Sequence, residues 1–266
     1  MQATRVAADG GDIFCVHAGP ADAKTRAILL LHGWTLDHRM WGPQLAAFAH
    51  DRFVLAPDRR GFGVSTAPPD LAREADDLVA ILDHFAVKET ILVGMSQAGR
   101  VAIDFALRFP GRVCSLVLQG APASGVTPGP DEDETIPIVE YAALARAGRL
   151  DEMKRRWRVH PLMRTSAPEA ALIVEAMLES YAGRDLGATN YLRDSEPRDL
   201  AQIEAPTLVI TGALDTPWRR RAGDALARAL AGAERVEIEG GGHLCNLDQP
   251  KAFNEALEGF STCTGA

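Results

Sequence analysis

The sequence predicts an α/β fold: a mostly parallel eight-stranded sheet with helices on both faces and a helical lid inserted after the sixth strand. Three observations support this prediction. Short apolar runs alternate with segments of helical spacing, strand patterns disappear between residues 121 and 199, and the alternation then resumes. Such alternation is typical of parallel sheets whose crossover helices cover both faces. A chain of 266 residues can form one large domain with an insert.

The first 120 residues supply most of the predicted sheet. Weak alternation on either side of "DGGD" predicts a hairpin over 4–8 and 12–18. The apolar runs that follow are continuous, as expected of strands covered on both faces. In chain order we expect a strand at 26–33, a helix at 40–49, a strand at 52–61, a helix at 70–85, a strand at 90–95, a helix at 97–109 and a strand at 112–120.

The second half begins with a linker, "APASGVTPGPDEDE", rich in proline, glycine and acidic residues. Helical patterns follow at 136–147, 150–159, 168–182 and 184–193. The core then resumes with a strand at 205–215, a helix at 217–231, a strand at 234–240 and a helix at 246–260. We therefore expect residues 1–120 and 200–266 to form the core and residues 121–199 to form the lid.

Composition limits the partners that the chain could have. Hydrophobic residues make up 47%, charged residues 24%, and the net charge is −8. This charge offers no basic surface for nucleic acid or an anionic membrane, so we expect a small-molecule substrate, and a homo-oligomer stays open. The four cysteines lack the spacing of a disulfide framework or zinc site. Without a signal peptide or a long apolar run, the expected location is cytoplasmic.

A serine stands at the predicted junction between the strand at 90–95 and the helix at 97–109. This junction lies at the carboxyl end of the sheet, where open α/β sheets bind ligands. A strained turn needs small neighbours, and Gly94, Ala98 and Gly99 meet that need. Ser96 is therefore the candidate nucleophile, although a serine in an ordinary surface turn would have the same local pattern.

A serine hydroxyl becomes a useful nucleophile only when a base takes its proton. His243 lies in the glycine-rich stretch "IEGGGHLCN" after the last predicted strand, and Asp215 ends the strand before it. The chain order serine, aspartate, histidine is one of the known orders for this triad. Each residue alone has an ordinary interpretation, the aspartate as a turn former and the histidine as a loop residue. Together with Ser96 they predict a catalytic triad.

Two backbone N–H groups are candidates for an oxyanion hole. The N–H of Gln97 lies in the first turn of the helix after Ser96, and the N–H of Trp34 lies in the loop after the strand at 26–33. In the predicted cycle, His243 deprotonates Ser96, which attacks a carbonyl, and the two N–H groups bind the negative oxygen. His243 then protonates the leaving group and activates water. This cycle requires no metal and no cofactor.

These motifs resemble those of the α/β-hydrolase family over nearly the whole chain. The resemblance is carried by "HGW" at 32–34, "DRRGFGVS" at 58–65, "GMSQAG" at 94–99, "GALD" at 212–215 and "GGGHLCNLDQP" at 240–250. The first half looks similar to cofactor-free perhydrolases (the bacterial non-heme haloperoxidases) and esterases, and the end looks similar to 3-oxoadipate enol-lactonases. The resemblance implies the same triad, the same oxyanion donors and a variable lid. The chain departs from the usual pattern by having Ala98 where the family's turn has glycine.

We expect a serine hydrolase that cleaves a small to medium carboxylic ester or lactone through an acyl-enzyme on Ser96. A perhydrolase, a thioesterase and a carbon–carbon bond hydrolase would use the same residues, and these alternatives stay open. A ligand-binding protein without catalytic activity is a further alternative on this fold. A serine at this position argues against the family's dehalogenases and epoxide hydrolases, whose nucleophile is a carboxylate.

Specificity is expected to depend on the lid. Trp157 and Met163 are candidates to line an apolar acyl pocket, and His160 or Arg164 could meet a substrate carboxylate. The alternative is that Trp157 packs the lid onto the core and the arginines form a solvated helix face. The side chain of Trp34 is a further candidate for substrate contact, because its backbone already lies at the site.

Overall fold

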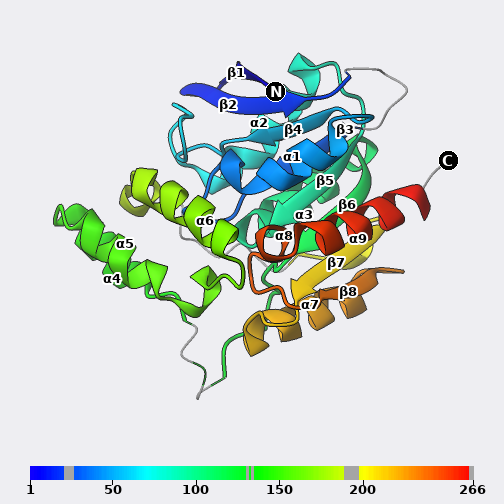
Figure 1. Cartoon of the computed structure of the whole chain (residues 1–266). Coiled ribbons are helices and arrows are strands. Elements are labelled where there is room, and N and C mark those ends of the chain that lie inside the picture. The colour runs from blue at the N-terminus through cyan, green and yellow to red at the C-terminus, as the bar shows by residue number, and fades with distance from the viewer. Residues whose placement is uncertain (21–26, 130–131, 133–134, 189–197, 264–266) are drawn as a thin grey trace.

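The computed structural model of the chain describes residues 1–20, 27–129, 132, 135–188 and 198–263, with the backbone alone at 261–263. The described residues form one sheet of eight strands, in the order β1-β2-β4-β3-β5-β6-β7-β8 (Figure 1). The strands are β1 (Gln2–Ala8), β2 (Gly11–Ala18), β3 (Ala27–Leu31), β4 (Val54–Pro57), β5 (Thr90–Met95), β6 (Val113–Gln119), β7 (Thr207–Gly212) and β8 (Glu234–Ile238). β2 pairs antiparallel with β1 and β4, and the remaining neighbours are parallel. The predicted sheet is confirmed.

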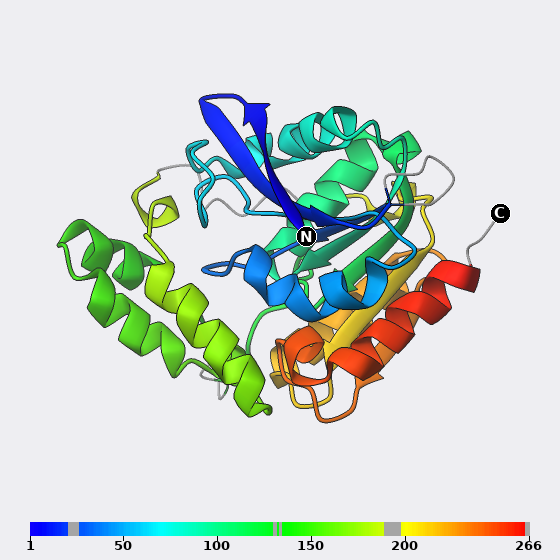
Figure 2. The same ribbon diagram turned by 45° about the horizontal axis from the view of Figure 1, so that its top comes forward.

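Continuous apolar runs form the central strands because helices cover both faces of the sheet. Every residue of β3 is buried, and successive side chains point to opposite faces. Ile28 and Leu30 pack into the core shared with α1 and α9, whereas Leu29 and Leu31 pack into the core shared with α2, α3 and α7 (Figure 2). These helices are α1 (Gly42–Phe48), α2 (Glu74–His84), α3 (Gln97–Arg108), α7 (Pro217–Ala229) and α9 (Pro250–Cys263).

Three helices lie to one side of the sheet, between β6 and β7 in the chain (Figures 1 and 2). They are α4 (Ile138–Arg146), α5 (Leu150–Arg158) and α6 (Pro168–Ser180). Their buried side chains, among them Met153 and Met177, belong to the same apolar cluster as α1 and α9. The described part of 121–199 contains no strand, in agreement with the sequence pattern.

The predicted helix over 184–193 is wrong for the residues that the structure describes. Only a 3₁₀ turn is present, at Asp185–Gly187. Gly183 has a φ of +65°, which no right-handed helix contains, and Ala188 is extended. The backbone conformations of Gly183 and Ala188 therefore confine the helical conformation to one turn. Residues 189–193 lie outside the described residues.

The last predicted helix is divided in two. α8 (Cys245–Asp248) ends before Gln249, whose φ is −135°, and α9 begins at Pro250. Proline lacks the N–H that a continuous helix would use, and it disfavours helical backbone at the residue before it. The break allows the axis of α9 to take a different direction from that of α8.

Two expectations drawn from composition concern thiols and membranes. Cys15, Cys114 and Cys245 are free thiols, and the side chain of Cys263 lies outside the described residues. Among the helices that the structure describes, none combines the length and the apolar character needed to cross a bilayer.

Candidate active site

Ser96 occupies a sharp turn between β5 and α3. Its φ of 52° and ψ of −119° are unusual for a residue with a side chain, and such a conformation costs about 1–3 kcal/mol. Two backbone hydrogen bonds hold the turn: the Ser96 N–H donates to the Gln119 carbonyl at 2.7 Å, and the Gly99 N–H donates to the Ser96 carbonyl at 2.9 Å. The surrounding structure therefore maintains a strained serine at the carboxyl end of the sheet.

Small residues around Ser96 allow the strand and the helix to cross closely. A Cβ on Gly94 would lie 2.6 Å from the Ala98 carbonyl oxygen, and one on Gly99 would lie 2.4 Å from the Cβ of Ala121. Ala98 is completely buried. The extra methyl group at the position where the family has glycine is accommodated, because the close contacts fall on its neighbours.

His243 and Asp215 are joined by a hydrogen bond. The Nδ1 atom of the imidazole lies 2.9 Å from Oδ2 of Asp215, and both residues are buried. The other carboxylate oxygen accepts the N–H of Thr216 at 2.7 Å. Since Nδ1 donates to the carboxylate, the neutral ring presents Nε2 as the atom that can accept a proton.

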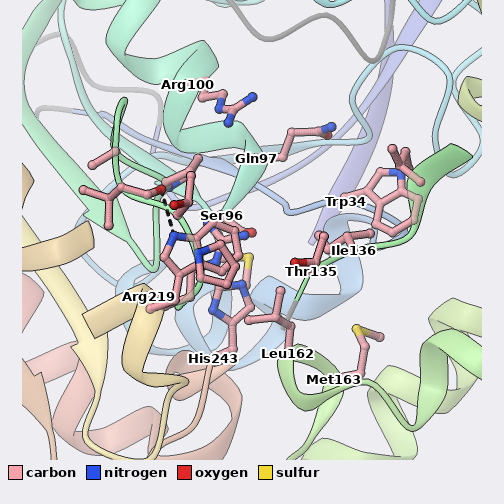
Figure 3. A pocket seen from close by; sticks show the side chains of 18 of the residues that line it. Trp34, Ser96, Gln97, Arg100, Thr135, Ile136, Leu162, Met163, Arg219 and His243 are labelled. Carbon is pink, nitrogen blue, oxygen red and sulfur yellow. Dashed lines mark hydrogen bonds between the residues drawn. The ribbon is translucent and has the colours of Figure 1, made fainter. Parts of the chain in front are cut away.

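Residues 119 and 120 connect the turn at Ser96 with the imidazole. Gln119 accepts the Ser96 N–H, and the next residue, Gly120, lies against the ring of His243. A Cβ on Gly120 would be 2.8 Å from Cε1 of that ring. Ser96 and His243 line the same cavity (Figure 3). The hydrogen bonds of the described residues do not include one between the Ser96 hydroxyl and the imidazole; such bonds are often long without substrate and shorten when it binds.

The two predicted oxyanion donors belong to segments that lie next to the serine. Gln97 is the first residue of α3, and the N–H groups of a helix's first turn have no acceptor within the helix. The loop after β3 passes directly against the turn, because a Cβ on Gly33 would lie 3.5 Å from Cβ of Ser96. Trp34, the next residue, lines the cavity.

The cavity has a volume of about 400 Å³, which is in the range of small-molecule sites. Most of its wall is apolar and includes the side chains of Trp34, Leu36, Leu71, Met95, Ile136, Ile138, Trp157, Leu162, Met163 and Leu244. In Figure 3, Arg219 lies on one side of Ser96 and Trp34 on the other. The cavity thus places a hydroxyl and an imidazole inside an apolar pocket.

A family model, "Alpha/beta hydrolase family", matches residues 28–256. The chain belongs to this family. The resemblance seen in the sequence motifs is therefore confirmed, and so is the fold class. Because the match extends from β3 into the first half of α9, it covers every loop that carries a predicted site residue.

Relatives of this α/β hydrolase are named for different enzymatic activities. A 3-oxoadipate enol-lactonase from Acinetobacter baylyi is 26% identical and aligns over 93% of this chain and 92% of its own. A 2-hydroxy-6-oxononadienedioate/2-hydroxy-6-oxononatrienedioate hydrolase from Klebsiella pneumoniae is also 26% identical, over 95% and 92%. Among solved structures, the esterase RhEst1 from Rhodococcus sp. ECU1013 superposes with a TM-score of 0.82 at 26% identity over the full length of both chains.

Two of the residues considered for substrate contact lie away from the cavity of this hydrolase. His160 and Arg164 are not among the described residues that line it. The ring of His160 packs on Trp157 with 4.6 Å between centroids, and its Nδ1 accepts the Leu162 N–H. Arg164 is exposed. Trp34, Trp157 and Met163 do line the cavity.

Sequence reasoning missed two buried polar residues near the site. Arg219, in the first turn of α7, lines the cavity, and its guanidinium lies 4.2 Å from the centre of the Trp218 ring. Its position four residues after Asp215, where a helix starts at the carboxyl end of the sheet, was a usable signal. Asp185 binds the indole of Trp34, and no local pattern marks it, because 151 residues separate the two.

Among the residues that the structure describes, one group of side chains has the spacing of a metal site. Ligand atoms of Asp37, His38 and Asp58 lie within 4.8 Å of one another. The acidic groups already accept hydrogen bonds: Asp37 from Arg39, and Asp58 from His38. Burial alone would lower the pKa of His38, but the hydrogen bond to Asp58 and the negative charges of Asp58 and Asp37 together raise it. We assign the group to loop structure, and it lies outside the cavity lining.

His32 supports the loop that carries Trp34. Its Nδ1 donates to the Gly33 carbonyl at 2.8 Å, and its Nε2 accepts the Arg59 N–H at 2.9 Å. Burial and the Arg59 guanidinium lower the pKa of His32 to about 4, so the ring is neutral at physiological pH. Arg59 also forms a buried ion pair with Glu74 and donates to the Gln97 side chain. The loops that carry Trp34 and Gln97, the two predicted oxyanion donors, therefore share one buried polar network.

Proposed function

We propose that this α/β hydrolase is a serine hydrolase that cleaves small to medium carboxylic esters or lactones through an acyl-enzyme on Ser96. The observation that carries the proposal is the hydrogen bond between His243 and Asp215 in the wall of the cavity that Ser96 lines. Family membership alone would not select the nucleophile. A strained serine that lines the same cavity as an imidazole bonded to a carboxylate through Nδ1 supports this chemistry.

The imidazole acts as the general base in this mechanism. Asp215 accepts the Nδ1 proton, which leaves Nε2 of His243 to remove the proton of the Ser96 hydroxyl. The alkoxide attacks the ester carbonyl, and the negative oxygen accepts the N–H groups of Trp34 and Gln97. The imidazolium then protonates the leaving alcohol. In the second half, His243 activates a water molecule that releases the acid from Ser96.

The shape and polarity of the cavity support the proposed substrate class. Its volume suits a small or medium molecule. Trp34, Leu162 and Met163 offer an apolar surface to an acyl or alcohol group. We further propose that residues 121–199 act as the lid, since Trp157, Leu162 and Met163 come from this segment and line the pocket. A substrate with a purely polar body would not bury enough apolar area here.

Substitution of the serine tests the proposal. The assay is hydrolysis of p-nitrophenyl acetate, butyrate and octanoate, a γ-lactone and an acyl thioester, and labelling by a fluorophosphonate probe. We expect Ser96→Ala to lose at least about 1000-fold in kcat and to abolish labelling, because removal of a triad member has effects of this size or larger. A peroxide arm, which measures peracid formation from the same esters, distinguishes a perhydrolase.

A matched serine provides the control. Ser115 is buried on β6, donates to the Cys114 carbonyl and lies outside the cavity lining. Ser115→Ala should therefore retain the activity and the labelling of the wild type. Retention of full ester hydrolysis by Ser96→Ala would show that another group is the nucleophile. A preference for the thioester over every oxygen ester would replace the esterase proposal with a thioesterase.

A further inference from the structure

Asp185 is a fully buried carboxylate in the short 3₁₀ turn that follows α6. Each of its oxygens accepts one hydrogen bond from an aromatic side chain. Nε1 of Trp34 donates to Oδ2 at 2.6 Å, and the Tyr181 hydroxyl donates to Oδ1 at 2.6 Å. The carboxylate thus joins the lid segment to the residue whose backbone N–H we assign to the oxyanion hole.

A carboxylate in this position is costly for stability. In the part of the chain that the structure describes, no basic side chain lies within ion-pair distance of Asp185. Burial holds the pKa of the carboxyl above its usual value, although the bonds from Tyr181 and Trp34 and the more distant charge of Arg59 act in the opposite direction. Burying a carboxyl group among neutral donors costs free energy relative to an apolar residue of similar volume. Its presence therefore needs a reason other than stability.

The segment that Asp185 holds is itself strained. Thr35 has a φ of 64°, an uncommon conformation for a β-branched residue. Its hydroxyl donates to the Trp34 carbonyl at 2.6 Å and accepts the Nε1 proton of Trp157 at 2.8 Å. The indole of Trp34 also packs edge-on against Trp157, with 4.8 Å between centroids. Residues 34 and 35 are therefore held by the lid segment at two points.

We infer that Asp185 is a positioning residue for the oxyanion hole. It fixes the indole of Trp34, and through it the direction of the Trp34 backbone N–H, relative to the Ser96 hydroxyl. This inference rests on the proposed serine-hydrolase function. The lid segment contributes to transition-state stabilisation as well as to the wall of the pocket. An oxyanion donor must lie within a few tenths of an ångström of its place, and a shift of about 1 Å can cost about 100-fold in rate.

Two substitutions act on the same hydrogen bond from opposite sides. Asp185→Asn replaces one of the two acceptor oxygens with an NH2 group, so that Trp34 and Tyr181 no longer each have an acceptor oxygen of their own, and Trp34→Phe removes the indole N–H while keeping an aromatic ring. Active sites are counted with a fluorophosphonate, so that unfolded protein does not enter kcat. For p-nitrophenyl butyrate we expect each variant to lose about 10- to 100-fold in kcat and to keep KM within about threefold.

Two readouts separate positioning from a general loss of stability. The inhibition constant of phenylboronic acid, whose serine adduct places an oxygen in the oxyanion hole, should rise by about the factor by which kcat falls. The double variant should be no slower than the slower single variant, within about twofold, because both changes remove one interaction. Thr90→Val is the control: it deletes a buried hydrogen bond to the Ala27 carbonyl at the other end of β5, and should leave kcat per labelled site unchanged.

The outcomes distinguish the inference from the function on which it rests. A wild type that neither hydrolyses esters nor reacts with the fluorophosphonate overturns the proposed function. An active wild type, with Asp185→Asn and Trp34→Phe both within about twofold in kcat and in boronic acid affinity, overturns only the positioning role. If Asp185→Asn does not fold, Trp34→Phe alone decides between these results, because it leaves the carboxylate in place. Multiplicative losses in the double variant would also contradict the inference.

Discussion

At the residue scale, the site depends on positions where a side chain has no room. Gly120 is the clearest case, because its φ is +54° and a Cβ would meet Cε1 and Nδ1 of His243 at 2.8 and 2.9 Å. Gly120 is close to two members of the proposed triad: it lies against His243, and its neighbour Gln119 accepts the Ser96 N–H. An added Cβ at residue 120 would therefore force the imidazole or the backbone of residue 120 to shift.

Substitution of this glycine should impair catalysis as well as stability. We expect Gly120→Ala to displace the imidazole and to lower kcat for p-nitrophenyl esters by about 10- to 100-fold. Gly232→Ala is the control, because Gly232 has a φ of +67° but no atom within 4 Å of its added Cβ. Both variants should lose about 1 kcal/mol in the free energy of unfolding, and only Gly120→Ala should lose activity. Equal activity of the two would contradict the role assigned to Gly120.

At the element scale, the loop between β8 and α8 is fixed by a residue that sequence reasoning passed over. Asp248, in α8, accepts the Gly242 N–H with one oxygen at 2.8 Å and the Ser166 N–H with the other at 2.7 Å. Ser166 in turn donates its hydroxyl to the Gly240 carbonyl. The loop that carries His243 is thus tied to the start of α6, just as the loop of Trp34 is tied to the turn after α6.

Loss of one of these acceptors should loosen the loop. Asp248→Asn keeps the shape but turns one acceptor into a donor, so we expect a loss of about 1–3 kcal/mol in the free energy of unfolding and a lower kcat. Urea unfolding and ester hydrolysis measure the two effects. Asp224→Asn breaks only a half-exposed ion pair with Arg235, and should change stability by less than about 0.5 kcal/mol. The prediction fails if both variants unfold at the same urea concentration.

At the scale of the whole molecule, the sheet separates two apolar cores, and the helices α4, α5 and α6 belong to one of them. Tyr141, Met153 and Met177 share a cluster with Leu45 and Phe253 on the α1 and α9 side. The buried polar network of His32 crosses between the loops at the carboxyl end of this sheet. The protonation state of His32 therefore affects the stability of the molecule as a whole.

The pH dependence of folding should reveal this histidine. The pKa of His32 is about 4 in the folded protein and near 6.5 in the unfolded chain. The unfolded chain therefore takes up the proton first as pH falls. The stabilising contribution is complete above about pH 6.5 and is lost as pH falls toward about 4. The full loss is on the order of 3 kcal/mol. Urea unfolding between these pH values should show a steeper decline for the wild type than for His32→Gln.

The comparison with a variant is necessary because other groups titrate nearby. Burial raises the pKa of Glu74 and of Asp77, so their effect has the opposite sign: the folded state holds their protons longer, and stability falls as pH rises through that range. Both proteins contain these carboxyls, and the difference between the two profiles isolates His32. Parallel profiles would remove His32 as a source of acid sensitivity.

The sequence by itself determined the sheet and the turn at Ser96. The alternation of apolar runs with helical patterns is a local property, and the set of small residues around a strand-to-helix turn is local too. Both could therefore be recognised from the sequence alone. Chain order and strand ends were also enough to select Asp215 and His243, whose hydrogen bond the structure contains.

Only the tertiary structure decided which distant side chains support these residues. Asp185 meets Trp34 across 151 positions of the chain, and Ser166 meets Asp248 across 82. The tertiary structure also shows that Arg219 belongs to the described cavity lining and that His160 and Arg164 do not. The physical reason is that local patterns fix the conformation of a segment, whereas the partner of a buried polar group depends on how segments far apart in the chain pack together.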